Sequence, residues 1–245
     1  MARYDAVFFD LYGTLIDIRT DEWSQAAWEA LRVALNDAGA GYADGDEAKR
    51  RFDEELAREM SGPEDDRWYE PEYIPVYQRM LAAHGVDADE STARAIGWVF
   101  RHSTTSLFRL YPGVLELLEA LGKAGIRTVL VSNAQSSFTR PELALLGLDK
   151  ALDRILISSE EGTRKPGPKL FELALRREGI DAKRAVMVGN DTTCDIAGAA
   201  SAGIDGIYLH TEISPESDPD ECPQALLSCK GADYGAVLDF VLGRD

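Results

Sequence analysis

Hydrophobic positions follow two different patterns along the chain. Short apolar runs, rich in valine, isoleucine, leucine and phenylalanine, predict buried strands at 6–9, 127–131, 154–158, 185–188 and 206–209. Between the later runs, apolar residues recur at helical spacing and predict helices near 114–124, 169–178 and 196–202. Strands that alternate with helices are typical of an α/β fold, in which helices cover both faces of a parallel sheet.

The region after the first strand has a different texture. Apolar residues such as Trp23 and Ala27 recur at helical spacing, and charged residues occupy the other positions. We predict no strand here. The pattern indicates an all-helical cap domain at 18–108, inserted into a core domain made of 1–17 and 109–245.

Polar residues stand where the predicted strands end. Asp10 follows the first run, Ser132 and Asn133 follow the second, and Asn190 and Asp191 follow the run at 185–188. In parallel α/β sheets the ligand binds beyond the carboxyl ends of the strands. The sequence therefore predicts an active site at this edge, with the helical cap above it.

The residue types at this edge suit chemistry on an anionic group. A carboxylate such as Asp10 can act as a nucleophile. The hydroxyl of Ser132 and the amide of Asn133 suit an anionic oxygen. Thr14 can hydrogen-bond the loop or a bound anion, and Lys165 can offset negative charge.

A divalent cation fits the same edge. Asp191 and Asp195 are four residues apart, and Asp10 offers a further carboxylate. Oxygen atoms of this kind are the ligands that hard divalent cations take.

Taken in order, four motifs resemble the haloacid dehalogenase (HAD) superfamily of hydrolases, and the resemblance covers nearly the whole chain. They are D-L-Y-G-T-L at 10–15, Ser132-Asn133, Lys165-Pro166, and G-N-D-T-T-C-D at 189–195. The resemblance implies a Rossmann-like parallel sheet flanked by helices, with an inserted helical cap of the C1 type.

The resemblance also implies a role for each motif residue. Asp10 becomes the nucleophile, and Lys165 steadies the nucleophile and the transferred group. The other implied roles are phosphate binding by Thr14, Ser132 and Asn133, Mg²⁺ binding by Asp10, Asp191 and the backbone carbonyl of Tyr12, and support from Asn190 and Asp195. Asn190 occupies the position where many relatives carry the metal-binding acid, and we favour Asp191 because a carboxylate binds magnesium better than an amide does.

Tyr12 departs from the phosphatase pattern. Phosphatase members carry a second aspartate at this position, which protonates the leaving alcohol and then activates water. A phenol, with a pKa near ~10, can donate a proton but is a poor base at pH 7. Loss of general acid–base help typically costs about 10²–10⁴-fold in rate.

Tyrosine at position 12 resembles the 2-haloacid dehalogenases of the same superfamily, because a halide leaves without a proton. Other positions disagree: Phe171 stands where those enzymes carry tyrosine, and Asn190-Asp191 replaces their Ser-Asn pair. The sequence therefore predicts a magnesium-dependent phosphatase of a small phosphorylated metabolite. A 2-haloacid dehalogenase and a non-catalytic binding protein of the HAD fold are the alternatives.

Composition and net charge limit the classes of binding partner. With 26 basic and 43 acidic residues the formal net charge is −17, which argues against non-specific binding to nucleic acid or to an anionic membrane. Three cysteines without a C-x-x-C pair predict free thiols. No stretch approaches the roughly 18 apolar residues of a membrane-spanning helix. We predict a cytoplasmic protein with a small-molecule substrate and leave its oligomeric state open.

Overall fold

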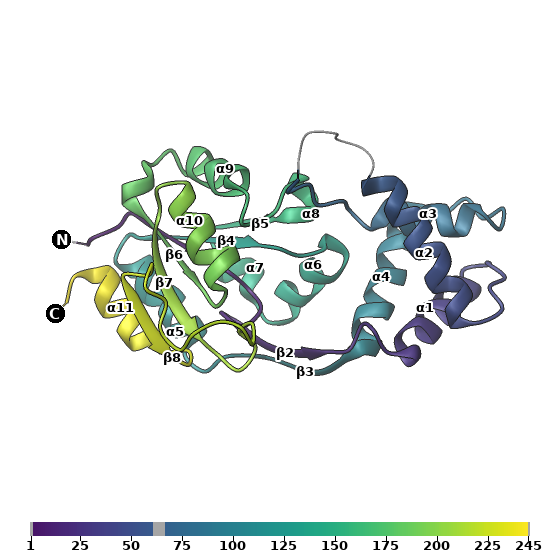
Figure 1. The fold of residues 1–245 in the computed structure, drawn as a ribbon, viewed down its shortest axis with the longest axis horizontal. Helices are drawn as coiled ribbons and strands as arrows, with labels where there is room; N and C mark the ends of the chain where they lie inside the picture. The colour runs from purple at the N-terminus through teal and green to yellow at the C-terminus, as the bar shows by residue number, and fades with distance from the viewer. Residues whose placement is uncertain (1, 61–66, 245) are drawn as a thin grey trace.

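A six-stranded parallel sheet forms the centre of the core. The computed structural model describes residues 2–60 and 67–244 (Figure 1). The strands lie in the order β5-β4-β1-β6-β7-β8, with bounds β1 Ala6–Phe9, β4 Arg127–Ser132, β5 Arg154–Ile157, β6 Ala185–Gly189, β7 Asp205–His210 and β8 Leu227–Lys230. Each neighbouring pair is parallel, so the predicted α/β fold is confirmed.

Both faces of the sheet are buried, as the central strand β1 shows. Its side chains alternate between the faces. Val7 and Phe9 belong to one apolar cluster, and Ala6 and Phe8 belong to another. The first cluster includes residues of α5 (Val114–Lys123) and α11 (Tyr234–Leu242), and the second includes residues of α9 (Pro168–Glu178) and α10 (Gly198–Ser201).

Shorter elements complete the core. They are α6 (Ser136–Leu145), α7 (Leu148–Ala151), α8 (Ser158–Glu161), a 3-10 turn (Ala182–Arg184) and a π-helical turn (Thr192–Ala197). Both β8 and α11 lie beyond the last element that the sequence predicted. The four-residue strand β8, Leu-Ser-Cys-Lys, has only a weak apolar pattern.

The helical region packs around an apolar cluster of its own. It consists of α1 (Gln25–Asp37), α2 (Gly45–Met60), α3 (Ile74–Ala82) and α4 (Glu90–Thr104), which lie together at the right of Figure 1. Trp28, Leu31, Phe52, Tyr77 and Phe100 are buried in this cluster. We call these four helices the cap helices.

A two-stranded antiparallel ribbon connects the cap helices to the core. Its strands are β2 (Ile16–Thr20) and β3 (Thr105–Leu110). The prediction that the 18–108 region holds no strand was therefore wrong at its two ends. The charge on β2 hid the strand, because buried Asp17 is paired with Arg19 and Arg109 at 2.7 and 2.8 Å.

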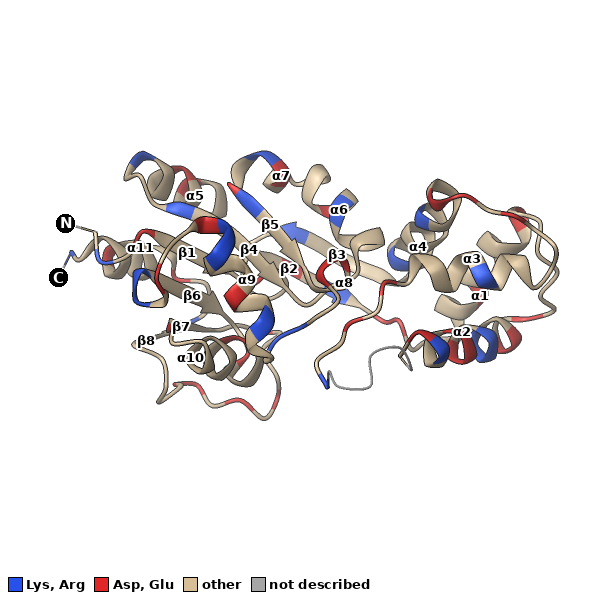
Figure 2. Cartoon of the chain, turned by 90° about the horizontal axis from the view of Figure 1, so that it is seen from above, with Lys and Arg blue, Asp and Glu red and all other residues tan. Residues whose placement is uncertain are grey.

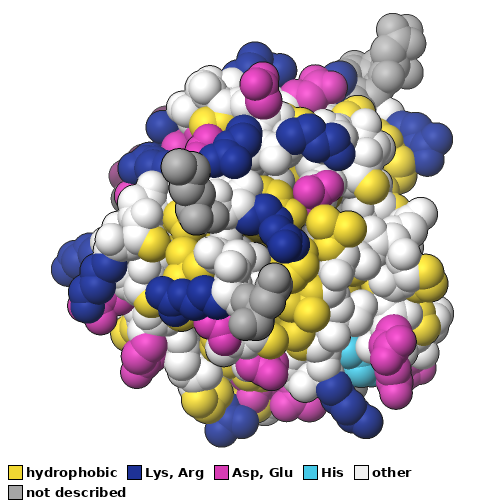
Figure 3. Space-filling model, turned by 90° about the vertical axis from the view of Figure 1, so that its left-hand side faces the viewer, with side chains coloured by type: hydrophobic (Ala, Val, Ile, Leu, Met, Phe, Trp, Pro, Cys, Tyr) yellow, Lys and Arg dark blue, Asp and Glu magenta, His cyan; other side chains and the backbone are white. Residues whose placement is uncertain are grey.

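The ribbon runs across the predicted domain boundaries at 17/18 and 108/109, which remain a prediction. Acidic and basic residues both occur along α2 (Figure 2), and the end of the core away from the cap helices also carries charges of both signs (Figure 3). Within the ranges that the structure describes, no helix combines the length and the apolarity needed to cross a bilayer.

Helix α1 offers a matched pair of residues that tests the cap cluster. Leu31 is fully buried, whereas Val33 is 43% exposed. Leu31→Ala should lower the free energy of unfolding by about 2–5 kcal/mol, because it leaves a cavity in the cluster. Val33→Ala should change it by less than about 0.5 kcal/mol. Urea unfolding checks this, and equal effects of the two variants would contradict the packing described.

Candidate active site

Three neighbouring strands bring the predicted site residues together. Strand β1 pairs with β4 on one side and with β6 on the other, so their carboxyl ends meet at one edge. Asp10 follows β1, and its backbone N–H donates to the carbonyl of Val188 in β6 at 3.0 Å. The strand-end cavity at this edge has a volume of about 200 Å³ and is lined by Asp10, Tyr12, Asn133, Lys165, Asn190, Asp191, Cys194, Asp195, Ile213 and Pro215.

Lys165 is the centre of the site. Its ammonium group bridges two carboxylates, with Nζ 2.7 Å from Asp10 Oδ1 and 2.6 Å from Asp195 Oδ1. Its side chain is only 1% exposed. Burial alone would lower the pKa of Lys165, but the two carboxylates outweigh burial and raise it, so the lysine stays charged. Burial raises the pKa of Asp195.

Asn133 holds the lysine in place through its backbone. The backbone N–H of Lys165 donates to Asn133 Oδ1 at 2.8 Å, and Asn133 Nδ2 donates to the carbonyl of Lys165 at 2.9 Å. The side-chain amide is therefore engaged with the loop that carries Lys165. Asn133 also lines the cavity, and contact between its amide and phosphate stays a prediction.

Ser132 is placed differently from Asn133. It is fully buried, and its hydroxyl has no hydrogen-bond partner among the described residues. An unpaired buried hydroxyl costs free energy unless something binds it. The hydroxyl therefore has a donor to spare, and its contact with a phosphate oxygen stays a prediction.

The fourth motif forms a turn around Asp195. Asp195 Oδ2 accepts the backbone N–H groups of Asn190 and Asp191, each at 3.0 Å. A side chain on Gly189 would collide with the Asp195 carboxylate, which explains the glycine at this position. Asp195 thus binds both the loop backbone and the lysine.

Asn190 and Asp191 face different partners. Asp191 Oδ1 accepts the N–H groups of Thr193 and Cys194, at 2.8 and 2.7 Å, and caps the π-helical turn. Asn190 is buried, and its Oδ1 lies 3.4 Å from the hydroxyl of Thr14. That hydroxyl is also 3.4 Å from Asp10 Oδ2, so Asn190 sits beside the nucleophile candidate.

The oxygen atoms at this edge suit Mg²⁺. In the ranges described, no three side chains among His, Cys, Asp and Glu group as a metal site. Asp10, Asn190 and Asp191 nevertheless line one cavity with two carboxylates and one amide oxygen. Mg²⁺ is usually held by one or two carboxylates and keeps several waters, so this small set fits it. Binding by the backbone carbonyl of Tyr12 stays a prediction.

The Tyr12 hydroxyl is hydrogen-bonded to residues of α6 and is not positioned for general acid–base catalysis. It donates to Glu142 Oε2 at 2.5 Å and lies 3.0 Å from the hydroxyl of Thr139. Burial, and then the neighbouring Glu142 carboxylate, raise the pKa of this phenol further above its usual value. The phenol is thus less able than a free phenol to lose its proton and act as a base. Its O–H group already donates to Glu142.

A second cavity adjoins the first on the side of the cap helices. This cap-side cavity has a volume of about 310 Å³ and shares Tyr12 and Asn133 with the strand-end cavity. Its other lining residues are Glu22, Glu70, Tyr73, Arg101, Ala134, Gln135, Phe138 and Arg164. Sequence reasoning missed these residues, because they belong to none of the four motifs.

The cysteines fit the sequence analysis. All three are free thiols, as predicted. Cys194 lines the strand-end cavity, and burial together with the nearby Asp191 raises the pKa of its thiol to about 12. The thiol therefore stays protonated at neutral pH and is a poor nucleophile.

A family model and known proteins agree with this geometry. The model of the haloacid dehalogenase-like hydrolases matches residues 4–203. The chain belongs to this family. It is 30% identical over 210 residues to a glyceraldehyde 3-phosphate phosphatase of Methanothermobacter thermautotrophicus, covering 85% of this chain and 87% of that protein. It is also 30% identical to an N-acetylmuramic acid 6-phosphate phosphatase of Pseudomonas aeruginosa, covering 87% of each.

Solved structures share the fold of this HAD hydrolase. An HAD phosphatase from Thermococcus onnurineus superposes with a TM-score of 0.60 at 21% identity, covering 98% of this chain and 99% of that one. A 2-haloacid dehalogenase from Pseudomonas syringae gives a TM-score of 0.61 at 24% identity, covering 96% and 97%. The resemblance and the hydrolase class that the sequence predicted are thus confirmed, and the fold does not separate the two chemistries.

The bridge of Lys165 can be tested by stability alone. Lys165→Ala leaves two buried carboxylates without their cation and should lower the free energy of unfolding by about 3–5 kcal/mol at neutral pH. The loss should shrink as the pH falls, because protonation of one carboxylate relieves the repulsion. Lys183→Ala is the control, since Lys183 is 77% exposed and lies 3.5 Å from Asp205. Equal small losses in the two variants would contradict a structural bridge.

Proposed function

We propose that this HAD hydrolase is a magnesium-dependent phosphatase of small phosphorylated metabolites. The observation that carries the proposal is the bridge of Lys165 between Asp10 and Asp195, beside the unpaired hydroxyl of Ser132. The two relatives at 30% identity named above are phosphatases, which supports the same choice.

The side chains of the site have separate roles in the transfer of the phosphoryl group. Lys165 binds Asp10 Oδ1, which leaves Oδ2 to attack phosphorus while the bond from phosphorus to the ester oxygen breaks. Solvent water protonates the departing oxygen. Ser132 donates to an oxygen of the phosphoryl group, and the ammonium of Lys165 offsets its charge. Water then attacks phosphorus in the aspartyl-phosphate, so that phosphate leaves and Asp10 is restored.

Mg²⁺ would be held by Asp10, Asn190 and Asp191. When bound, it supplies positive charge that stabilises the oxygens of the transferring phosphoryl group. The chain's own residues fix the remaining geometry, since Asp195 holds the backbone of Asn190 and Asp191.

The cap-side cavity sets the class of substrate. Its volume of about 310 Å³ suits a small metabolite. Two acids, Glu22 and Glu70, balance two bases, Arg101 and Arg164, on its walls. A neutral polar tail on the phosphate fits such a balanced wall better than a second strongly charged group does.

The first test is phosphate release from p-nitrophenyl phosphate with Mg²⁺ and after its removal by a chelator. Asp10→Asn should lower kcat/KM by at least about 10³-fold, because the amide cannot attack phosphorus. The exposed Asp87→Asn should leave turnover unchanged. Removal of Mg²⁺ should also abolish turnover.

The outcome that contradicts the proposal is equally specific. Metal-independent release of halide from a 2-haloacid, without phosphate release from any ester, would assign the chain to the dehalogenases. Tyr12 in the first motif is what favours that second candidate.

Tyr12 generates a further prediction about the leaving group. Because the Tyr12 hydroxyl donates its hydrogen bond to Glu142, the residue at position 12 does not act as an acid toward the departing alcohol. The rate should therefore fall steeply as the pKa of the leaving alcohol rises, by about 10²–10⁴-fold more than general acid catalysis would allow. A series of aryl and alkyl phosphates measures this slope. A flat series would show that another acid protonates the leaving group.

A further inference from the structure

Four side chains from distant parts of the chain meet beside the cap-side cavity. Tyr12 comes from the loop after β1, Glu22 from the segment after β2, Arg101 from α4 and Glu142 from α6. Arg101 Nε donates to Glu142 Oε1 at 2.8 Å, and Arg101 Nη1 donates to Glu22 Oε1 at 2.5 Å. We call these four residues the Arg101 cluster.

Arg101 and Glu142, the central pair of the cluster, are buried, so their charges depend on one another. The side chains of Arg101 and Glu142 are 8% and 3% exposed. Buried charges are costly unless they are paired and hydrogen-bonded. The guanidinium also lies over two rings, 5.0 Å from the centre of Tyr12 and 5.5 Å from that of Phe138.

Glu142 links two regions that move apart if the cap helices swing away. One of its oxygens accepts from Tyr12, next to the strand-end cavity, and the other accepts from Arg101 on a cap helix. One turn earlier, α4 lies close against α6, because a Cβ on Gly97 would be 2.9 Å from Ser137 Oγ. The carboxylate thus closes a contact that is already tight.

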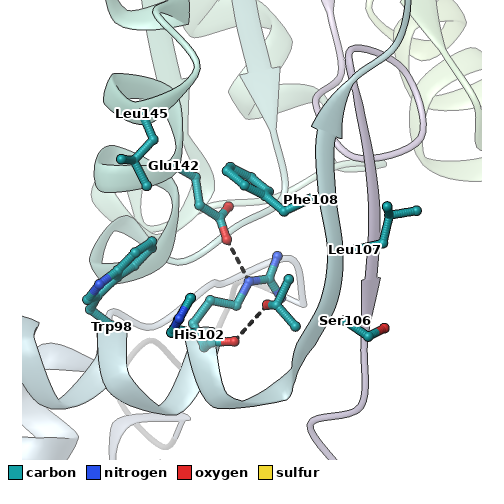
Figure 4. A pocket seen from close by; sticks show the side chains of 9 residues that line it. Trp98, His102, Ser106, Leu107, Phe108, Glu142 and Leu145 are labelled. Atoms are coloured by element: carbon teal, nitrogen blue, oxygen red, sulfur yellow. Dashed lines mark hydrogen bonds and ion pairs between the residues drawn. The ribbon is translucent and has the colours of Figure 1, made fainter.

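Figure 4 shows a cavity on the outer side of this pair. It has a volume of about 290 Å³, and Trp98, His102, Phe108 and Leu145 line it together with Arg101 and Glu142. Arg101 also lines the cap-side cavity, so it stands between two open spaces. Hydrogen bonds within the cluster, rather than tight packing on every side, therefore fix its geometry.

We propose that Glu142 is a positioning residue that acts through Tyr12. The carboxylate holds the phenol, and Tyr12 lines both the strand-end and the cap-side cavity, as Asn133 does. Held there, the ring leaves both cavities open to one substrate. Without the carboxylate, the phenol keeps only the hydroxyl of Thr139 and the guanidinium of Arg101 as neighbours, and the ring turns more readily into the path of the substrate tail, whereas the phosphate site at Asp10 is unaffected. This inference rests on the proposed phosphatase function.

Glu142→Gln tests the inference, because a neutral amide offers one oxygen where the carboxylate serves two donors. The KM for p-nitrophenyl phosphate should rise about 10-fold, which corresponds to one lost interaction of about 1.4 kcal/mol. The inhibition constant of inorganic phosphate, which fills the strand-end cavity alone, should change less than about twofold in the same variant. Glu160→Gln is the matched control, since Glu160 pairs with Arg140 away from both cavities.

Tyr12→Phe shows whether the effect passes through the phenol. It removes the hydroxyl and keeps the ring, so Glu142→Gln should raise KM no further in this background. Additive effects, or a rise in the phosphate inhibition constant equal to the rise in KM, would overturn the inference.

A measurement without substrate separates this inference from the proposed function. The urea midpoints of the wild type, the two single variants and the double variant form a second cycle. The double variant should shift the midpoint no more than the larger single variant does. Additive shifts would overturn the inference even in an active enzyme, whereas a wild type without phosphatase activity would overturn only the function on which it rests.

Discussion

A buried ammonium group between two carboxylates is the interaction on which the site depends. Lys165 lies 2.7 Å from Asp10 and 2.6 Å from Asp195. Either carboxylate alone would be costly to bury, and the two together would repel each other. The ammonium group of Lys165 offsets both negative charges at once. It also fixes which oxygen of Asp10 is left for chemistry.

The rest of the site serves to hold that lysine and its neighbours. Asn133 binds the backbone of Lys165 through two hydrogen bonds, and Asp195 binds the backbone of Asn190 and Asp191. The parallel sheet supplies these loops at one edge because β1 lies between β4 and β6. On the other side, the cap helices reach the site through Arg101, which donates to Glu142 of α6, and Glu142 in turn accepts from Tyr12.

The amino-acid sequence predicts the parts of the molecule that local chemistry determines. The apolar run before Asp10 predicts β1, and polar residues at strand ends predict the site. It could not predict β2 and β3, whose charges are hidden by pairing across the ribbon. Nor could it predict the partner of Tyr12, since Glu142 is 130 residues away and belongs to no motif. Long-range pairing of single side chains leaves no periodic signal in a sequence.

The central claim is that Asp10 carries the phosphoryl group during turnover. Rapid acid quench of a single turnover with p-nitrophenyl phosphate and Mg²⁺, followed by peptide mass spectrometry, tests it most directly. Because Tyr12 gives little help to the attacking water, the phosphorylated peptide should accumulate before phosphate is released, with the modification on Asp10. Complete turnover without a phosphorylated enzyme, or with the phosphoryl group on another residue, would contradict the account.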